Sequence, residues 1–124
     1  MTSTEQKILS LRPFIGAKDV EVSRRFYRDF GFLENTISPT LFYYSKQGMG
    51  FYLQDAYVKE WVDNTMLFLQ VDDVEQYRVD LLLLRLPEKY ATVQLSAIRT
   101  ESWGKEFSVH DPSGILWHIG QFHD

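Results

Sequence analysis

The sequence carries the same short pattern twice, and this repeat constrains the fold more than any other feature. Residues 17–21 are AKDVE and residues 71–75 are VDDVE. Each copy follows an apolar run typical of a strand and opens an amphipathic, helix-like segment, so one strand-then-helix unit is used twice. The second copy continues to a turn at residues 110–114 (HDPSG) and a final strand-like run. We therefore expect two equivalent modules that mix strands and helices.

The first module is predicted to span residues 8–55. A strand over 9–17 precedes a helix that Asp19 caps, because its carboxylate can accept from the free amides of the first turn. Gly31 ends the helix, since glycine adopts positive φ without strain. Turn residues at Ser38-Pro39 and Gln47-Gly48 separate three further strands. These strands are expected over residues 32–36, 41–46 and 50–54.

A connector over residues 56–64 leads to the second module, residues 65–122, within a single domain of residues 1–124. A strand over 66–71 precedes a helix capped by Asp73, with Gln76 as its capping-box partner. Pro87 is expected to stop this helix after Leu84. Three more strands are expected over residues 92–99, 105–110 and 115–121, which makes both modules βαβββ.

The composition excludes several classes of partner. The net charge is -4 and no basic cluster stands out, so we expect no nucleic-acid partner. The chain has no cysteine, which excludes disulfides and thiolate metal sites and agrees with a cytoplasmic location. No apolar run approaches the ~20 residues that span a membrane, so we expect no membrane partner. The aromatic fraction of 15% is high, which favours a lined cavity or an interface.

Several short motifs, in this order and at this spacing, give the chain a resemblance to a known superfamily. They are residues 17–20 (AKDV), 26–32 (FYRDFGF), 69–74 (LQVDDV), 103–104 (WG), 106–109 (EFSV), 111–114 (DPSG) and 120–121 (GQ). The sequence resembles the vicinal oxygen chelate superfamily, also called the glyoxalase, bleomycin resistance protein and dioxygenase superfamily. The resemblance implies an α+β fold in which two βαβββ modules form curled mixed sheets around a shared cavity, with the helices outside.

The resemblance also allows the chain to be checked for the metal ligands that many members of the superfamily carry. Metal-using members place His or Glu ligands near the middle of the first and last strand of each module, where this chain has Arg12, Tyr52, Met66 and His118. Only His118 could bind a divalent ion, and a guanidinium at the centre would repel it. We therefore expect no metal and no other cofactor, as in the metal-free bleomycin-resistance-like members.

Strand alternation then nominates the residues that face the cavity. On the first strand Arg12 and Phe14 are expected to face inward, and on the strand over 66–71 the apolar Leu67 and Leu69 leave Met66, Phe68 and Gln70 for the cavity. For any single aromatic residue, core packing is the more probable role, and His118 can equally be a hydrogen-bonded interior histidine. The predicted ligand-binding set is Arg12, Phe14, Tyr44, Tyr52, Gln54, Trp61, Met66, Phe68, Gln70, Trp103, Phe107 and His118.

The sequence thus predicts a metal-independent protein that binds or sequesters a small molecule, in the manner of drug or toxin resistance. Aromatic faces would stack on an aromatic or amphipathic, anionic ligand, Arg12 would supply a charge, and His118 with Gln70 would orient polar groups. No catalytic residue is assigned, since Glu21 and Glu75 occupy helix starts, where the helix dipole explains them. A metal-dependent lyase, isomerase or dioxygenase of the same superfamily is the alternative. A sensor or partner-binding module is a third hypothesis. In each case we expect a homodimer that covers the open sheet edges.

Overall fold

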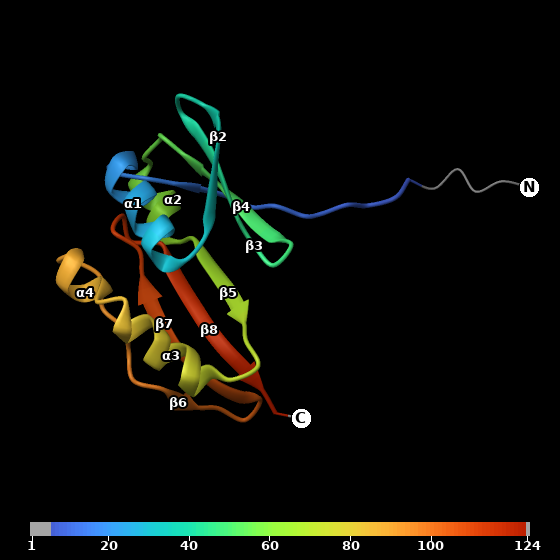
Figure 1. Ribbon diagram of the computed structural model, residues 1–124, viewed down its shortest axis with the longest axis vertical. Coiled ribbons are helices and arrows are strands. Elements are labelled where there is room, and N and C mark those ends of the chain that lie inside the picture. Colours follow the sequence, from blue (N-terminus) through green and yellow to red (C-terminus); the bar gives the residue numbers. More distant parts are fainter. Residues whose placement is uncertain (1–5, 124) are drawn as a thin grey trace, which may run out of the picture.

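The computed structural model describes residues 6–123, which form two four-stranded mixed sheets (Figure 1). The first sheet has the strand order β1-β4-β3-β2 and the second the order β5-β8-β7-β6. The elements are β1 (Phe14–Gly16), α1 (Val20–Phe30), β2 (Leu33–Ser38), β3 (Leu41–Lys46), β4 (Met49–Gln54), α2 (Lys59–Asp63), β5 (Met66–Gln70), α3 (Val74–Leu83), α4 (Leu86–Lys89), β6 (Arg99–Thr100), β7 (Gly104–His110) and β8 (Leu116–Phe122).

The two sheets repeat one topology. The first strand of each module runs parallel to the last, so β1 pairs with β4 and β5 pairs with β8. The remaining neighbours in each sheet are antiparallel. This arrangement confirms the predicted α+β class and the two βαβββ-like modules. The predicted curling of the sheets is not seen in residues 6–123, whereas the shared cavity stays a prediction. None of the helices within residues 6–123 is long and apolar enough to cross a membrane.

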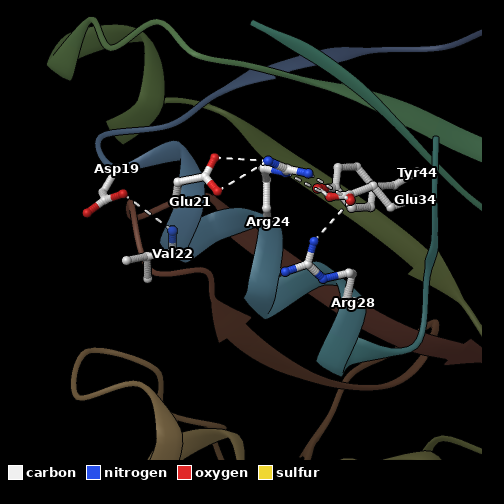
Figure 2. Close-up of polar contacts among 7 residues, drawn as sticks. All are labelled: Asp19, Glu21, Val22, Arg24, Arg28, Glu34 and Tyr44. Carbon is white, nitrogen blue, oxygen red and sulfur yellow. Dashed lines mark hydrogen bonds and ion pairs between the residues drawn. The ribbon is translucent and has the colours of Figure 1, made fainter. Parts of the chain in front are cut away.

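The helix ends follow the sequence signals. Asp19 accepts a hydrogen bond from the amide of Val22 at the start of α1 (Figure 2). Gly31 ends the helix with a φ of 112°, which a residue with a Cβ rarely adopts. Asp73 caps α3 by accepting from the amide of Gln76. The reciprocal half of the capping box is absent, because the Gln76 side chain donates to Asp80 instead.

The first strand is shorter than predicted. Hydrogen bonding of β1 to β4 covers only Phe14–Gly16, whereas the sequence pattern indicated a strand over residues 9–17. Pro13 precedes β1, and its carbonyl still accepts from the amide of Tyr52. Because proline has no amide hydrogen, it cannot donate to the ladder, and the strand begins after it. The preceding residues 6–13 lie outside any helix or strand, and Figure 1 shows them running away from both sheets.

Three other boundaries differ from the sequence prediction. The connector contains the short helix α2. Pro87 lies in the first turn of α4 rather than merely stopping α3, because the first amides of a helix have no partner and proline loses nothing there. Residues 92–98 form no named strand, and Leu95 makes a single bridge to Val109 before the two-residue β6. The predicted strand over residues 92–99 was therefore wrong for most of its length.

One hydrophobic cluster joins the two modules on the helix side of the sheets. Trp117 of β8 lies within 6 Å of the ring centroids of Tyr27, Phe32 and Phe51 from the first module. Along β4, Phe51 and Leu53 are buried in this cluster while the intervening Tyr52 is only half-buried. Each sheet thus uses one face for the core and presents the other face outward, and the outward faces carry the candidate site.

Candidate ligand-binding site

The outward face of the first sheet carries a cation over an aromatic cluster. The register sets Tyr52 of β4 opposite Phe14 of β1 on one side and Tyr43 of β3 on the other. Phe14 stacks on Tyr52 with ring centroids 4.7 Å apart, and Tyr43 lies 5.2 Å from Tyr52. The Arg12 guanidinium lies 4.2 Å from the centre of the Tyr43 ring and donates to the Tyr52 hydroxyl at 3.0 Å. Such geometry is favourable for both the cation and the rings.

Arg12 keeps a charge that no side chain within residues 6–123 neutralises. The side chain is exposed, and the described residues provide it with no carboxylate partner. The hydrogen bond to Tyr52 raises the pKa of Arg12, so the guanidinium stays positive at any physiological pH. A fixed cation beside aromatic faces is suited to a ligand with an anionic group and a flat apolar body.

The outward face of the second sheet carries a second aromatic cluster. This cluster consists of Phe68 of β5, Phe122 of β8 and Trp103, which directly precedes β7. Their ring centroids lie 5.0 to 5.8 Å apart. Gly120 lies beneath them, and a Cβ built there would come within 2.6 Å of the Phe68 ring. Glycine at this position therefore lets the rings lie close to the β8 backbone.

A polar group accompanies this second cluster. Glu106 of β7 is 9% exposed and accepts from Arg99. Its Oε1 lies 3.2 Å from Nδ1 of His118, and the other ring nitrogen of His118 lies 3.4 Å from the Met66 sulfur. The carboxylate thus fixes how the imidazole is oriented. His118 can bond to a ligand only through the nitrogen that faces Met66.

These side chains do not fit a divalent metal centre. The positions that superfamily resemblance associates with metal hold a guanidinium, a phenol and a thioether besides His118. One further side chain that could bind a metal, Glu106, contacts His118. Its carboxylate already accepts a hydrogen bond from Arg99. Within residues 6–123, no group of three or more His, Asp or Glu side chains is arranged to hold a metal ion. We derive no chemistry through a metal, and the metal-dependent alternative gains no support from these donors.

The structure divides the predicted ligand-binding residues into several groups. Arg12, Phe14 and Tyr52 lie together on the first outward face, and Met66, Phe68, Trp103 and His118 lie together on the second. Gln70 is exposed at the end of β5, and Gln54 is half-buried at the end of β4. Trp61 lies on the connector helix α2 and is 73% exposed.

Tyr44 and Phe107 lie in the core instead of on the outward faces. Both are 0% exposed. The Tyr44 hydroxyl donates a hydrogen bond to the Glu34 carboxylate. This carboxylate also accepts hydrogen bonds from Arg24 and Arg28 of α1, as Figure 2 shows. The residues that contact the predicted set but that sequence reasoning missed are Tyr43, Arg99, Glu106 and Phe122.

Comparison with solved structures identifies the same architecture in proteins of very different sequence. A bleomycin-binding protein from Streptomyces verticillus, complexed with copper(II)-bleomycin, superposes with a TM-score of 0.78 at 18% identity, over 96% of this chain and 100% of that one. TnmS3, an antibiotic-binding protein from a Streptomyces species, gives 0.72 at 18% identity over 98% and 100%. A lactoylglutathione lyase from Agrobacterium tumefaciens gives 0.70 at 16% identity over 94% and 96%.

No known family profile matches the sequence, and no curated protein matches it. At these low identities the structural likeness establishes the fold, while function depends on the site itself.

Proposed function

From the glyoxalase/bleomycin resistance, or vicinal oxygen chelate, superfamily fold that this chain has, we propose a metal-independent protein that sequesters a small molecule. The observation that carries the proposal is the Arg12 guanidinium, held over Tyr43 and bonded to Tyr52 with no carboxylate beside it among the described residues. The bleomycin-binding and antibiotic-binding structures support the class of function. Resistance to a drug or toxin by sequestration is the biological role that this class favours.

The proposed ligand is aromatic or amphipathic and carries an anionic group. Its charged end pairs with Arg12, and its flat body stacks on the exposed rings, which lose apolar surface to water in the process. His118 and Gln70 orient polar groups of the ligand from the second sheet. This arrangement requires the two outward faces to border one shared cavity, which is part of the proposal.

Replacing Arg12 by methionine tests the charged contact. Arg12→Met keeps much of the side-chain volume but removes the cation, so an anionic aromatic ligand should bind about tenfold more weakly, the scale of one lost charged hydrogen bond. Because Arg12 is exposed and has no acidic partner within the described residues, thermal unfolding should be unchanged. Arg25→Met, on the exposed side of α1, is the matched control and should leave affinity unchanged. Calorimetry with ligands from an anionic aromatic library supplies the measurement.

Trp103→Ala tests the stacking contact. Loss of its ring should weaken ligands of any charge, because stacking area disappears whatever the head group. Parent-like affinity of both variants for every ligand found would refute the proposal. Unfolding of Arg12→Met would also refute it, since that would make Arg12 a structural residue.

We further propose that two chains pair. The extended segment before β1 presents Ile8, Leu9 and Leu11, which are 86%, 83% and 94% exposed, and both outward faces carry exposed aromatic side chains. Apolar surface of this kind is commonly covered in an assembly. Sedimentation at micromolar concentration should give twice the chain mass. A value near 14.6 kDa would contradict the pairing.

A further inference from the structure

A cavity of about 600 Å³ lies between the modules on the core side of the sheets. The β3–β4 turn of the first module forms one wall, and β5 with α3 of the second module forms the other. Phe51, Leu67, Leu69 and Trp117 supply apolar surface from both modules. Cavities of roughly 300 to 1,000 Å³ with apolar walls are the size range of small-molecule sites.

This cavity is distinct from the candidate site on the outward faces. Phe51 and Trp117 are 3% and 4% exposed and belong to the hydrophobic cluster, whereas Phe14 and Tyr52 point away from that cluster. The edge strand β5 borders both regions. Phe68 reaches the cavity as well as the second aromatic cluster, and Gln70, which the proposed function assigns to the outward faces, also lines the cavity. Arg12 is not among the residues that line it.

The rim of the cavity is negatively charged. Asp72, Asp73 and Asp80 line it, against the single cation Lys46. Asp73 and Asp80 each accept one hydrogen bond from Gln76. A carboxylate has two oxygens with several lone pairs, so both retain acceptor capacity. Three carboxylates near one opening attract a cation and repel an anion, and the attraction weakens as salt is added.

Tyr77 belongs to the cavity wall, and its hydroxyl is covered in this structure. The Tyr77 hydroxyl is buried, and within the described residues it makes no hydrogen bond. Burial raises the pKa of Tyr77 to about 12, so the phenol remains neutral and can both donate and accept. An unpaired buried hydroxyl is unfavourable unless something binds it. The Lys46 ammonium lies 5.8 Å from the centre of the Tyr77 ring, so a protein cation already lies over this ring.

We propose that this cavity is a second small-molecule site, which takes a small cation with an apolar body, such as an arylalkyl amine. The aryl group packs against Phe51 and Trp117, and the ammonium takes the place of the Lys46 side chain. There it donates to the Tyr77 hydroxyl and is attracted by Asp72 and Asp80. The site has the opposite charge preference from the Arg12 face, so the charge of the bound probe distinguishes the two sites although they share Phe68 and Gln70.

Three probes of one shape test the charge preference: 4-phenylbutylamine, 4-phenylbutanol and 4-phenylbutyrate. Titration followed by amide NMR should show the amine binding most tightly and the carboxylate least. Shifts should centre on residues 46–51 and 67–80 rather than on Phe14, Tyr52 or Trp103. Equal affinities, a preference for the carboxylate, shifts centred on the outward faces, or no binding at millimolar amine would each overturn the proposal.

Charge variants should move the amine affinity in opposite directions. Asp72→Asn combined with Asp80→Asn should weaken 4-phenylbutylamine about tenfold at low salt and reduce the salt dependence of binding. Lys46→Met should strengthen it severalfold, because the competing ammonium is gone. Arg25→Met, which removes an exposed cation that does not line the cavity, is the matched control and should leave this affinity unchanged. A Lys46→Met variant that binds the amine more weakly would contradict the assignment.

Tyr77→Phe separates a ligand contact from a structural role. Removing an unpaired hydroxyl should leave the melting temperature unchanged or raise it, while the amine binds severalfold more weakly. A lower melting temperature with unchanged amine affinity would overturn the assignment, because it would show that the hydroxyl stabilises the free protein instead.

Discussion

Asp111→Ala is expected to lower the free energy of unfolding by about 4 kcal/mol, near the upper end for a single substitution. Asp111 is 1% exposed, and its Oδ1 accepts from the amides of Ser113, Gly114 and Ile115, each at 2.9 Å. Its Oδ2 accepts from the Tyr27 hydroxyl at 2.6 Å. Alanine leaves the Ser113 and Ile115 amides and the Tyr27 hydroxyl without this acceptor, whereas the Gly114 amide still donates to the backbone carbonyl of residue 111. Each unsatisfied buried donor costs about 1 to 3 kcal/mol before relaxation. Urea denaturation measures the loss.

Two variants show which half of the carboxylate matters. Asp111→Asn retains an oxygen for the three turn amides and should cost less than the alanine change. Tyr27→Phe leaves the three turn amides bonded and removes two other hydrogen bonds: the one to Oδ2 of Asp111, and the one that the Trp117 indole donates to the Tyr27 hydroxyl at 3.0 Å. This variant should lower the free energy of unfolding by about 2 kcal/mol. An Asp111→Ala protein as stable as the parent would show that these hydrogen bonds do not hold the turn.

Because of Glu34, the free energy of unfolding should fall strongly at acidic pH. Burial alone would raise its pKa, but hydrogen bonds from Arg24, Tyr44 and Arg28 outweigh burial and lower the pKa to about 2 (Figure 2). A carboxyl whose pKa is lower in the folded chain stabilises that chain above the unfolded value of 4.5, and the stabilisation is lost as the pH falls towards 2. We expect about 3 kcal/mol of unfolding free energy to be lost in this window from Glu34 alone.

Glu34→Gln isolates this contribution from the other acidic groups. The variant should be less stable than the parent at pH 7, and the difference should shrink steadily between pH 4.5 and 2, because the parent side chain becomes neutral as well. Urea denaturation at several pH values gives the difference directly. A stability difference that does not change with pH would show that the ion pairs on Glu34 do not stabilise the fold.

Much of the architecture could be predicted because local signals and the repeat agree. The two helices begin at residues whose side chains can cap them, and the 41–46 strand was predicted to the residue. The segment over 92–99 failed for the opposite reason. Its residues suit a strand, but whether they pair depends on a distant neighbour, and only Leu95 finds one in Val109.

The site was harder to predict than the fold because it depends on which face of a strand is buried. Tyr43 and Tyr44 are adjacent and chemically alike, so alternation alone cannot show which points outward. The structure buries Tyr44 against Glu34 and leaves Tyr43 beneath Arg12. The same ambiguity affected Phe107, whose neighbour Glu106 faces outward although it is polar and nearly buried. On β5 the alternation of Leu67 and Leu69 with Met66 and Phe68 was clear, and the predicted faces agree with the structure.

The bonds between the modules limit how such a duplicated chain could have arisen. Tyr27 of the first module supplies a partner to Asp111 of the second, and Trp117 of the second fills space among rings of the first. A half-length ancestor with either set of residues alone would have exposed an indole or left a buried carboxylate short of a donor. Such an ancestor would have needed a second copy of itself to complete its core. Fusion of two copies into one chain would then have turned a contact between subunits into a contact within one molecule.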